Sequence, residues 1–537
     1  MLENTVRRFH SYGPVDCEEH FCVPRRELVE RCTAQLIGHP EKGGHYFTIW
    51  APRQTGKTWL MRQAEQEILK RYPDQFTVYR FSLGNLRGMS FTPSESSSIE
   101  LPRAFCDVLE GALPKRPKIT YWKEFLALFS KEYGPWDRPL ILLIDEVDTA
   151  PPALLDLLVG RFRELYLDRR NHWLHGLALT GVRAVLGIES QRGSPFNIQR
   201  SLHVPNLTVE EVNDLYQQYQ DESGQQIAPA VVEQVYESTR GQPGLVSWFG
   251  ELLTEKYNPG QDKVIDTRTW QYVYVRACHA EFNNTVLNII KKAKTEYRQY
   301  VLELFSRADV RFSFDADWCN YMYMHGLIDE EMVESASGLP ESVCRFSSPF
   351  IQLRIYNALT YDLFDTHSPI LTLDPLDDLA DVFKGKILDL PALLRRYKDY
   401  LARLKAKGLN PWKEQPRRKT DLHLTEAVGH FHLYTWLQQT VGKRCVVSPE
   451  FPTGSGKVDI HVKCGDKRGI IEVKSFVDAY QAEVDRTKAA QYARSLQLDA
   501  VTLALFIPVE DETVLEKLSG EETINGVRVT VVAIGWV

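Results

Sequence analysis

The amino-acid sequence predicts a multidomain α/β protein, and three observations support this prediction. Residues 1–205 alternate apolar strand patterns with helical patterns, as a parallel sheet covered by helices does. Residues 207–257 show helical periodicity alone, which is typical of a small all-helical domain. Residues 417–537 carry the order α-β-β-β-α-β-β. With 537 residues the chain is long enough for three or four such domains.

The composition changes along the chain and marks five segments. Residues 362–389 contain seven Asp, two Lys and two Pro, which is typical of a linker with short helices. Before this linker, two helical patterns, a polar loop and the short strand Val343–Phe346 predict a winged helix. We predict an α/β core, a helical lid, a winged-helix-like domain, the linker and a second α/β domain, at residues 1–205, 206–262, 263–361, 362–416 and 417–537.

Charge and hydropathy exclude two classes of function. The formal charge is −7, so the whole protein is no general binder of polyanions, and any nucleic-acid surface must be local. No apolar run approaches the roughly 20 residues of a membrane helix, and the N-terminus lacks a signal-peptide pattern. We therefore expect a cytoplasmic protein without a membrane partner.

The cysteines lead to the same expectation. Their number, nine, is odd, and no CxxC pair occurs, which fits a reducing cytoplasm. Cys17, His20 and Cys22 lie close together, but no second ligand pair has a fitting spacing. We expect these three to be ordinary side chains rather than a metal site.

Four apolar runs in the first segment predict strands of a parallel sheet, at Tyr46–Trp50, Thr77–Phe81, Leu140–Ile144 and Leu177–Thr180. The first run is followed directly by Ala51-Pro52-Arg53-Gln54-Thr55-Gly56-Lys57-Thr58 and then by a helical pattern. A strand, a turn with Gly-Lys-Thr and a helix are the context of a phosphate-binding loop, whose backbone N–H groups cradle phosphates. In such a loop Lys57 contacts the β- and γ-phosphates and Thr58 binds Mg²⁺.

The third strand ends in two acids, Asp145 and Glu146. Acids at the carboxyl end of a buried parallel strand emerge where open α/β sheets bind their ligands. We expect Asp145 to hold the Mg²⁺ on Thr58 through water, and Glu146 to polarise the attacking water. The two motifs follow one another in the right order, so the sequence predicts nucleotide binding and hydrolysis.

Over roughly residues 20–360 the chain resembles the AAA-like and STAND-type P-loop ATPases of archaea and bacteria. The loop is similar to their "PRQ-x-GKT" form, with Ala51 in place of the usual first Gly. The resemblance implies that ATP is the nucleotide and that Thr180 is the sensor that orients the water. It also implies that Gly241-Gln242-Pro243 is the Gly-x-Pro motif of the lid, with Pro243 packed by the adenine. A plain helix-joining turn is the alternative interpretation of these three residues.

An arginine finger would act between subunits of an ATPase of this kind, so we expect a homo-oligomer. Four arginines are candidates, and the sequence does not choose among Arg169, Arg170, Arg183 and Arg192. For each of them taken alone, the sequence favours a surface arginine.

A basic run precedes the last domain. Residues 395–419 carry ten Lys or Arg against two acids, a local charge of +8. A run of this kind is usually a solvated helix face. Its position beside a second predicted site makes a contact with nucleic-acid phosphates the competing hypothesis, with Arg417, Arg418 and Lys419 nearest to that site.

The second predicted site lies on the strands of the last domain. A helix over Leu422–Gln439 precedes strands at Cys445–Ser448, Lys457–Val462 and Gly469–Val473, and a helix over Ala479–Leu496 precedes strands at Ala500–Ile507 and Val527–Ile534.

Asp459 lies on the second of these strands, and Glu472-Val473-Lys474 ends the third. Alternation places Glu472 and Lys474 on one face, and an adjacent hairpin strand can bring Asp459 beside them. Two carboxylates suit Mg²⁺ or Mn²⁺, which would activate water at a scissile phosphate, while Lys474 would stabilise the developing charge.

Residues 417–537 resemble the PD-(D/E)xK nuclease superfamily. Asp459 matches the first motif acid, Glu472 and Lys474 match the E-x-K, and Glu426 matches the acid of the first helix. The resemblance implies that Glu426 joins the metal site. Gln491-Tyr492 is similar to the glutamine and tyrosine that related nucleases use near DNA, although here the two are adjacent. A surface strand with a salt-bridged Glu-Lys pair is the alternative interpretation.

Together the two sites predict an ATP-controlled, metal-dependent DNA endonuclease, in which the ATPase and winged helix control the C-terminal domain. The family resemblance fits a role in prokaryotic defence or in a mobile element. Two other classes stay open. One is an ATP-dependent DNA-binding scaffold with a non-cutting nuclease-like domain, and the other is a signalling ATPase that acts on protein partners.

Overall fold

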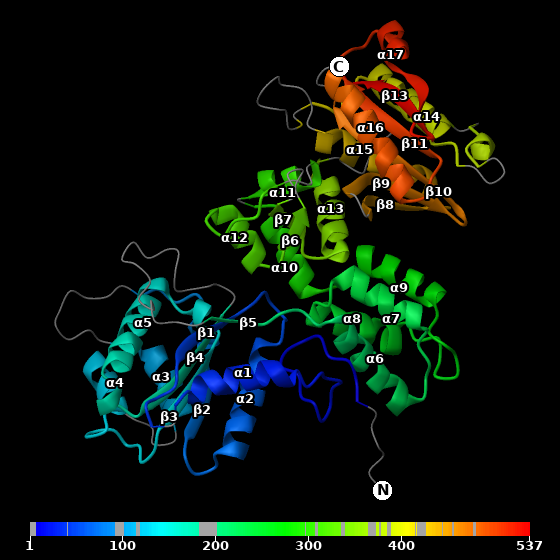
Figure 1. Ribbon diagram of the computed structural model, residues 1–537. Coiled ribbons are helices and arrows are strands. Elements are labelled where there is room, and N and C mark those ends of the chain that lie inside the picture. The colour runs from blue at the N-terminus through cyan, green and yellow to red at the C-terminus, as the bar shows by residue number, and fades with distance from the viewer. Residues whose placement is uncertain are drawn as a thin grey trace. The chain divides into compact units, whose positions relative to one another are not determined.

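The computed structural model describes most of the chain. The described residues are 7–39, 41–91, 101–113, 119–181, 201–295, 297–306, 310–334, 339–363, 372–374, 377–383, 388–413, 415, 426–442, 444–453, 456–475 and 479–536. They form two compact units (Figure 1). Unit 1 comprises residues 1–285 and 321–326, and unit 2 comprises residues 286–320 and 327–537. The five predicted segments stay predictions, since this division is coarser than theirs.

Unit 1 contains a five-stranded sheet in which every pair of neighbouring strands is parallel. The strand order is β2-β3-β4-β1-β5. Sequence expectation and structure agree closely here, because buried parallel strands are continuous apolar runs that are easily recognised. The strands are β1 (Tyr46–Trp50), β2 (Thr77–Ser82), β3 (Leu140–Asp145), β4 (Leu174–Gly181) and β5 (Ser201–His203).

Helices cover both faces of this sheet, as Figure 1 shows. On one face Phe47, Ile49 and Ile141 pack against α1 (Arg26–Ile37) and α2 (Lys57–Arg71). On the other face Leu142 and Leu179 pack against α3 (Arg103–Ala112), α4 (Trp122–Phe129) and α5 (Pro152–Leu167). Successive strand residues therefore face opposite cores, and the carboxyl ends of the strands are where open α/β sheets bind ligands.

The helical part of unit 1 follows β5. Its helices are α6 (Val209–Ser223), α7 (Pro229–Thr239), α8 (Pro243–Glu251) and α9 (Thr267–His279). Thr208 and Glu211 form a capping box at the start of α6, and Gly224 ends it with φ +74°. Pro243 is the first residue of α8, where its missing N–H costs no hydrogen bond.

Unit 2 begins with helices and a hairpin. They are α10 (Asn284–Ala293), α11 (Arg298–Ser306), α12 (Asp317–Met324), the antiparallel pair β6 (Ile328–Glu334) and β7 (Pro340–Phe346), and α13 (Pro349–Leu363). The first two residues of α10 and the last turn of α12 belong to unit 1. Helices followed by a hairpin are the elements that a winged helix needs, and this assignment stays a prediction.

A six-stranded mixed sheet completes unit 2, with the order β12-β13-β11-β10-β9-β8. Its strands are β8 (Val446–Thr453), β9 (Gly456–Cys464), β10 (Lys467–Ser475), β11 (Ala500–Ile507), β12 (Gly520–Ile524) and β13 (Val527–Gly535). The accompanying helices are α14 (Leu390–Ala406), α15 (Glu426–Val441), α16 (Ala479–Ser495) and α17 (Glu512–Leu518). Ile470 and Leu503 pack under Ala489, Ala490 and Ala493 of α16.

The structure corrects the expectation for the cysteines. Cys17 is bonded to Cys22, and Cys445 is bonded to Cys464. The cysteine count did not indicate these two pairs, because the other five cysteines are free and buried and make the total odd. In the part of the chain that the structure describes, no helix is long and apolar enough to cross a membrane.

Candidate functional site

The strand order of unit 1 brings the predicted nucleotide residues together. β4 lies between β1 and β3, so Thr180 at the end of β4 stands between the loop after β1 and Asp145 at the end of β3. All three therefore lie at the carboxyl edge of the sheet, where open α/β sheets bind ligands.

The loop before α2 holds its lysine close to the backbone. Lys57 Nζ donates to the carbonyls of Ala51 at 2.8 Å and Pro52 at 2.6 Å. Burial lowers the pKa of Lys57 to about 8, against the opposing effect of Asp145. Gly56 has φ +91°, a conformation that glycine adopts without strain. A phosphate could take the place of these carbonyls as the partner of the ammonium group.

Asp145 is the centre of a small hydrogen-bond network. Thr58 Oγ1 donates to Asp145 Oδ2 at 2.6 Å, and the buried Thr180 hydroxyl donates to Asp145 Oδ1. The backbone N–H of Glu146 donates to the same Oδ1 at 2.8 Å. A hydroxyl and a carboxylate at this distance are the oxygen ligands that Mg²⁺ prefers, so Thr58 and Asp145 fit a nucleotide-bound Mg²⁺.

Glu146 has a partner that sequence reasoning missed. Its backbone is in the left-handed region with φ +53°, and Ser82 Oγ donates to its carboxylate at 2.6 Å. Arg87 lies 4.0 Å from the same carboxylate. Ser82 ends β2 and pairs in register with Asp145, so its place could have been found from the alignment of β2 with β3.

The turn that begins α8 contacts the phosphate-binding loop. Gln242 Nε2 donates to the carbonyl of Arg53 at 3.0 Å, and the Gly244 N–H donates to the carbonyl of Gln54 at 3.1 Å. The Gln54 side chain donates to the carbonyl of Ser11 at 2.9 Å. Pro243 thus lies between two residues that contact the loop. Thr55, which is buried, closes the turn by donating to Pro52 at 2.9 Å.

The two candidate arginine fingers that the structure describes are not brought to this site. Arg169 and Arg170 precede β4, at the amino edge of the sheet, opposite to the loop. Arg169 lies over the ring of Tyr166, 5.0 Å from its centroid. Arg183 and Arg192 lie outside the described residues.

Unit 2 contains a second cluster, in which Lys474 is surrounded by carboxylates. Its Nζ lies 3.0 Å from Glu426 Oε1, 3.4 Å from Asp459 Oδ2 and 3.9 Å from Glu472 Oε2. In the antiparallel pairing of β9 with β10, the last paired residues are Ile460 and Ile471. Asp459 and Glu472 come directly after this pair, one on each strand. Glu426 is the first residue of α15.

Burial and mutual repulsion govern the titration of this cluster. Burial raises the pKa of Glu472 well above its usual value, and Asp459 raises it further. Burial also raises the pKa of Glu426 to about 7, although Lys474 opposes the shift. Burial lowers the pKa of Lys474, but the three carboxylates outweigh burial and hold this pKa well above its usual value. One lysine therefore neutralises only part of the negative charge of three acids.

The donor set fits a divalent cation. Glu472 Oε1 is buried and has no hydrogen-bond partner among the described residues. Among the described residues, no group of three or more His, Cys, Asp or Glu is arranged to hold a metal. In this cluster Lys474 lies beside the carboxylates. The carboxylates of Asp459, Glu472 and Glu426 are nonetheless the oxygen donors that a divalent cation prefers, and the buried oxygen of Glu472 is a polar atom that such an ion would satisfy.

Hydrogen bonds to its backbone carbonyl and to its carboxylate hold Asp459 in position. His430 Nε2 lies 2.7 Å from the Asp459 carbonyl, and the Tyr356 hydroxyl lies 3.1 Å from His430 Nδ1. The carbonyl can only accept, so Nε2 carries the hydrogen. Asp459 Oδ2 also accepts from the Val473 N–H at 2.7 Å. His430 is thus a buried positioning residue.

Helix α16 contributes one further predicted residue. Tyr492 is half-buried, and burial raises its pKa, with Glu472 as the next cause. Gln491 is exposed, in keeping with its position next to Tyr492 on the helix. Asp485, two turns earlier, affects the pKa of both Tyr492 and Glu426. Sequence reasoning missed Asp485, which shares the helical face of Tyr492.

In the basic run before this domain, at least three of the seven described Lys and Arg residues form ion pairs. Arg396 binds Asp377 and Asp381, Lys398 binds Glu512, and Lys405 binds Glu510. In α14 these contacts favour a salt-bridged helix face over a free phosphate-binding surface. Arg417, Arg418 and Lys419 lie outside the described residues.

Comparison with known proteins finds a family similarity in the first unit. Residues 10–271 match the model of a family described as "AAA-like domain". This part of the chain is therefore similar to the AAA-like domain family. No protein with a curated description matches the sequence.

Three solved structures match part of this chain at low identity and with TM-scores below 0.5. The Walker-type ATPase paby2304 of Pyrococcus abyssi is 15% identical, with 65% of this chain and 99% of that chain covered and a TM-score of 0.44. The RuvB Holliday junction branch migration motor of Thermotoga maritima is 15% identical, with 59% and 91% covered and a TM-score of 0.32. The Orc1 protein of Aeropyrum pernix, in complex with DNA, is 13% identical, with 64% and 94% covered and a TM-score of 0.31.

Proposed function

We propose that this chain is an ATP-controlled DNA endonuclease that uses Mg²⁺ or Mn²⁺, with the nucleotide site in unit 1 and the cutting site in unit 2. The observation that carries the proposal is the arrangement of Lys474 among Asp459, Glu472 and Glu426, with a buried, unpartnered oxygen on Glu472. A protein acting in this way on DNA would belong in the cytoplasm, and the ATPase part would act as a homo-oligomer.

In the nucleotide site each residue has a distinct role. Lys57 leaves the carbonyls of Ala51 and Pro52 to bind the β- and γ-phosphates. Thr58 and Asp145 hold the Mg²⁺ that neutralises phosphate charge. Glu146 accepts a hydrogen bond from the attacking water, and Thr180 fixes the Asp145 carboxylate that the site is built around.

In the cutting site the carboxylates of Asp459, Glu472 and Glu426 would hold the metal ion. The metal, when bound, activates a water and neutralises the scissile phosphate. Lys474 lies within reach of each carboxylate and would stabilise the charge that develops on the phosphate oxygens or orient the water. His430 fixes the backbone of Asp459, and Tyr492 lines the approach from α16.

The cutting activity is tested on plasmid DNA with the full chain and Mg²⁺ or Mn²⁺. We expect cleavage that is lost in Asp459→Ala and in Lys474→Ala and is retained in Lys463→Ala, an exposed lysine of the same sheet. DNA binding without cutting would replace the proposal with a scaffold function. Absence of DNA binding at low salt would favour a signalling ATPase with protein partners.

Control by ATP is tested separately with Lys57→Ala, which removes the charge that binds phosphate. We expect this variant to lose ATP binding and to change the rate of DNA cleavage in the presence of ATP. Unchanged cleavage with and without ATP would contradict the control function and would leave the nuclease proposal standing.

A further inference from the structure

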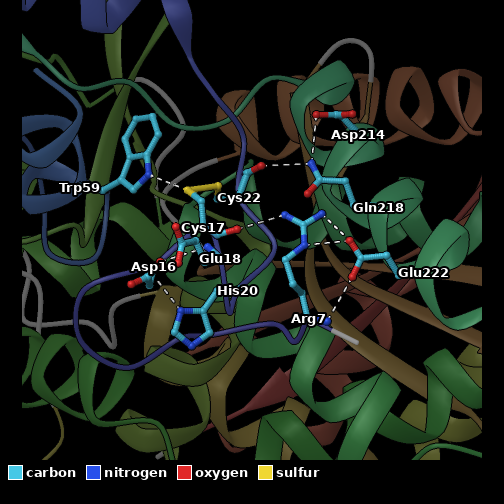
Figure 2. The surroundings of a disulfide bond; sticks show 10 residues. All are labelled: Arg7, Asp16, Cys17, Glu18, His20, Cys22, Trp59, Asp214, Gln218 and Glu222. Atoms are coloured by element: carbon cyan, nitrogen blue, oxygen red, sulfur yellow. Dashed lines mark hydrogen bonds and ion pairs between the residues drawn. A yellow bond between two sulfur atoms is a disulfide. The ribbon is translucent and has the colours of Figure 1, made fainter. Parts of the chain in front are cut away.

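The Cys17–Cys22 disulfide lies between the two parts of unit 1 that enclose the nucleotide loop. Figure 2 shows its surroundings. Cys17 Sγ accepts a hydrogen bond of 3.4 Å from Trp59 Nε1, and Trp59 follows Thr58 in α2. On the other side, the Cys22 carbonyl accepts from Gln218 Nε2 of α6 at 3.0 Å. The small loop closed by the disulfide therefore touches both the helix after the phosphate-binding loop and the first lid helix.

Arg7 strengthens the contact with the lid. Its guanidinium donates to the Cys17 carbonyl at 3.4 Å and to Glu222 of α6 at 2.5 Å (Figure 2). Phe9 packs against Tyr216 and Tyr219 of the same helix, with ring centroids 4.9 and 5.9 Å apart. Residues 7–25, here called the N-terminal strap, are thus anchored on α6 at several points.

The strap also reaches the nucleotide loop itself. The Ser11 carbonyl accepts from Gln54, and the Ser11 N–H and hydroxyl donate to Glu251 of α8 at 2.6 and 2.9 Å. Gln54 in turn accepts from Gly244 at the start of α8. Order in the strap therefore contributes to the position of both the loop and the lid.

The disulfide is open to chemical exchange. Both Cys17 and Cys22 are half-buried rather than enclosed. The five-residue separation closes a short loop that contains no residue of the five-stranded sheet, so reduction removes a local constraint and leaves the sheet intact. The five free cysteines, by contrast, are all buried. Access and position together single out this pair for thiol–disulfide exchange.

We propose that Cys17–Cys22 is a thiol–disulfide exchange site whose redox state sets the affinity of the nucleotide loop, an inference that rests on the proposed nucleotide site. A thiolate of a dithiol reductant attacks one sulfur and forms a mixed disulfide. The second reductant thiol then resolves it. Two electrons pass to the protein sulfurs, which leave as two thiols after protonation, and the reductant becomes a cyclic disulfide.

Reduction weakens nucleotide binding because the strap is then less ordered in the free protein. Ordering the strap when ATP binds lowers the net free energy of binding. A ligand that binds only when the strap is ordered loses affinity in proportion to the ordered fraction. We expect ATP to bind about tenfold more weakly to the reduced chain, within the range that closure of a short loop can supply.

The test measures ATP affinity of the full chain with Mg²⁺ by calorimetry, after treatment with oxidised glutathione or with dithiothreitol. Mass mapping of alkylated peptides reports the state of Cys17 and Cys22 in each sample. The double variant Cys17→Ser/Cys22→Ser should bind ATP as the reduced chain does under both conditions. The matched control Cys445→Ser/Cys464→Ser lacks the disulfide of unit 2 and should keep the full redox response.

Three results would overturn the inference. They are free thiols at Cys17 and Cys22 in the oxidised chain, equal ATP affinities in both redox states, and a response that follows the Cys445–Cys464 pair. Absence of ATP binding in both states overturns the proposed nucleotide site as well, which separates that failure from the failure of the redox inference. Hydrogen exchange of residues 7–25 gives a second readout, and it should rise on reduction in the unmodified chain and be insensitive to redox state in Cys17→Ser/Cys22→Ser.

Discussion

The Ser82 hydroxyl donates a 2.6 Å hydrogen bond to the carboxylate of Glu146, the residue expected to polarise the attacking water. A carboxylate held by a neighbouring strand is not free to orient water at the γ-phosphate. Glu146 has a left-handed backbone conformation, and its side chain points toward Ser82 at the end of β2. The bond between these two residues therefore defines a resting state of the proposed ATPase.

Replacing Ser82 by Ala should speed ATP hydrolysis. The lost bond is worth about 1.5 kcal/mol when its acceptor is charged, and release of Glu146 should raise kcat by about tenfold or less. KM for ATP should stay unchanged, because the Ser82 hydroxyl bonds to Glu146 and the substitution leaves the strand pairing of Ser82 with Asp145 in place. Steady-state kinetics checks both values. Ser82→Thr keeps the hydroxyl and is the control, and a fall in kcat for Ser82→Ala would show that Ser82 supports Glu146 rather than restraining it.

Thr180 should affect hydrolysis more than binding. Its buried hydroxyl donates to Asp145, so Thr180→Val leaves that carboxylate short of one partner while keeping the volume of the side chain. We expect kcat to fall by about 10- to 100-fold, the effect of losing about 1.5–3 kcal/mol, with ATP affinity changed by much less. Thr180→Ser should restore most of the rate. Equal losses in affinity and rate would instead mean that Thr180 acts on nucleotide binding.

Elements with a strong local sequence pattern could be predicted, and elements without one could not. The strand β3 was predictable, because six buried residues in succession form a pattern that few other structures share. The strand β12 was missed, because Gly520–Ile524 is an exposed edge strand without apolar alternation. The helix α17, between β11 and β12, was missed with it.

The residues of the two sites differ in the same way. Lys57, Asp145 and Lys474 lie in motifs whose spacing along the chain reflects their chemistry. Ser82 and His430 act through contacts between elements that are distant in sequence, and no local pattern marks them. The cysteine pairs also depend on distance in space, so a count could not reveal them.

Acid should destabilise unit 2 through His432. Burial lowers the pKa of His432 to about 3, and its Nδ1 lies 2.5 Å from the Tyr397 hydroxyl. The unfolded chain binds a proton near pH 6.5 and the folded chain does not, so stability falls as the pH drops below that value. The loss should reach about 2 kcal/mol at pH 5 relative to pH 8. Urea unfolding of His432→Leu/Tyr397→Phe should show a correspondingly smaller acid loss, with Tyr397→Phe alone as the control. An identical pH dependence in the double variant would contradict a neutral, buried His432.

Lys474 should stabilise unit 2 when metal is absent and matter less when metal is present. Lys474→Ala leaves three carboxylates buried together without a cation, which should cost about 3–5 kcal/mol. Thermal unfolding in EDTA should therefore show a large fall in the midpoint of the unit 2 transition. Added Mg²⁺ or Mn²⁺ should restore part of it, because the cation replaces the lost charge beside Glu472 and Asp459. Lys463→Ala changes an exposed lysine of the same sheet and should respond to neither condition. A destabilised Lys474→Ala that no divalent cation stabilises would leave the cluster as a salt bridge and would remove the physical basis for metal-dependent cutting.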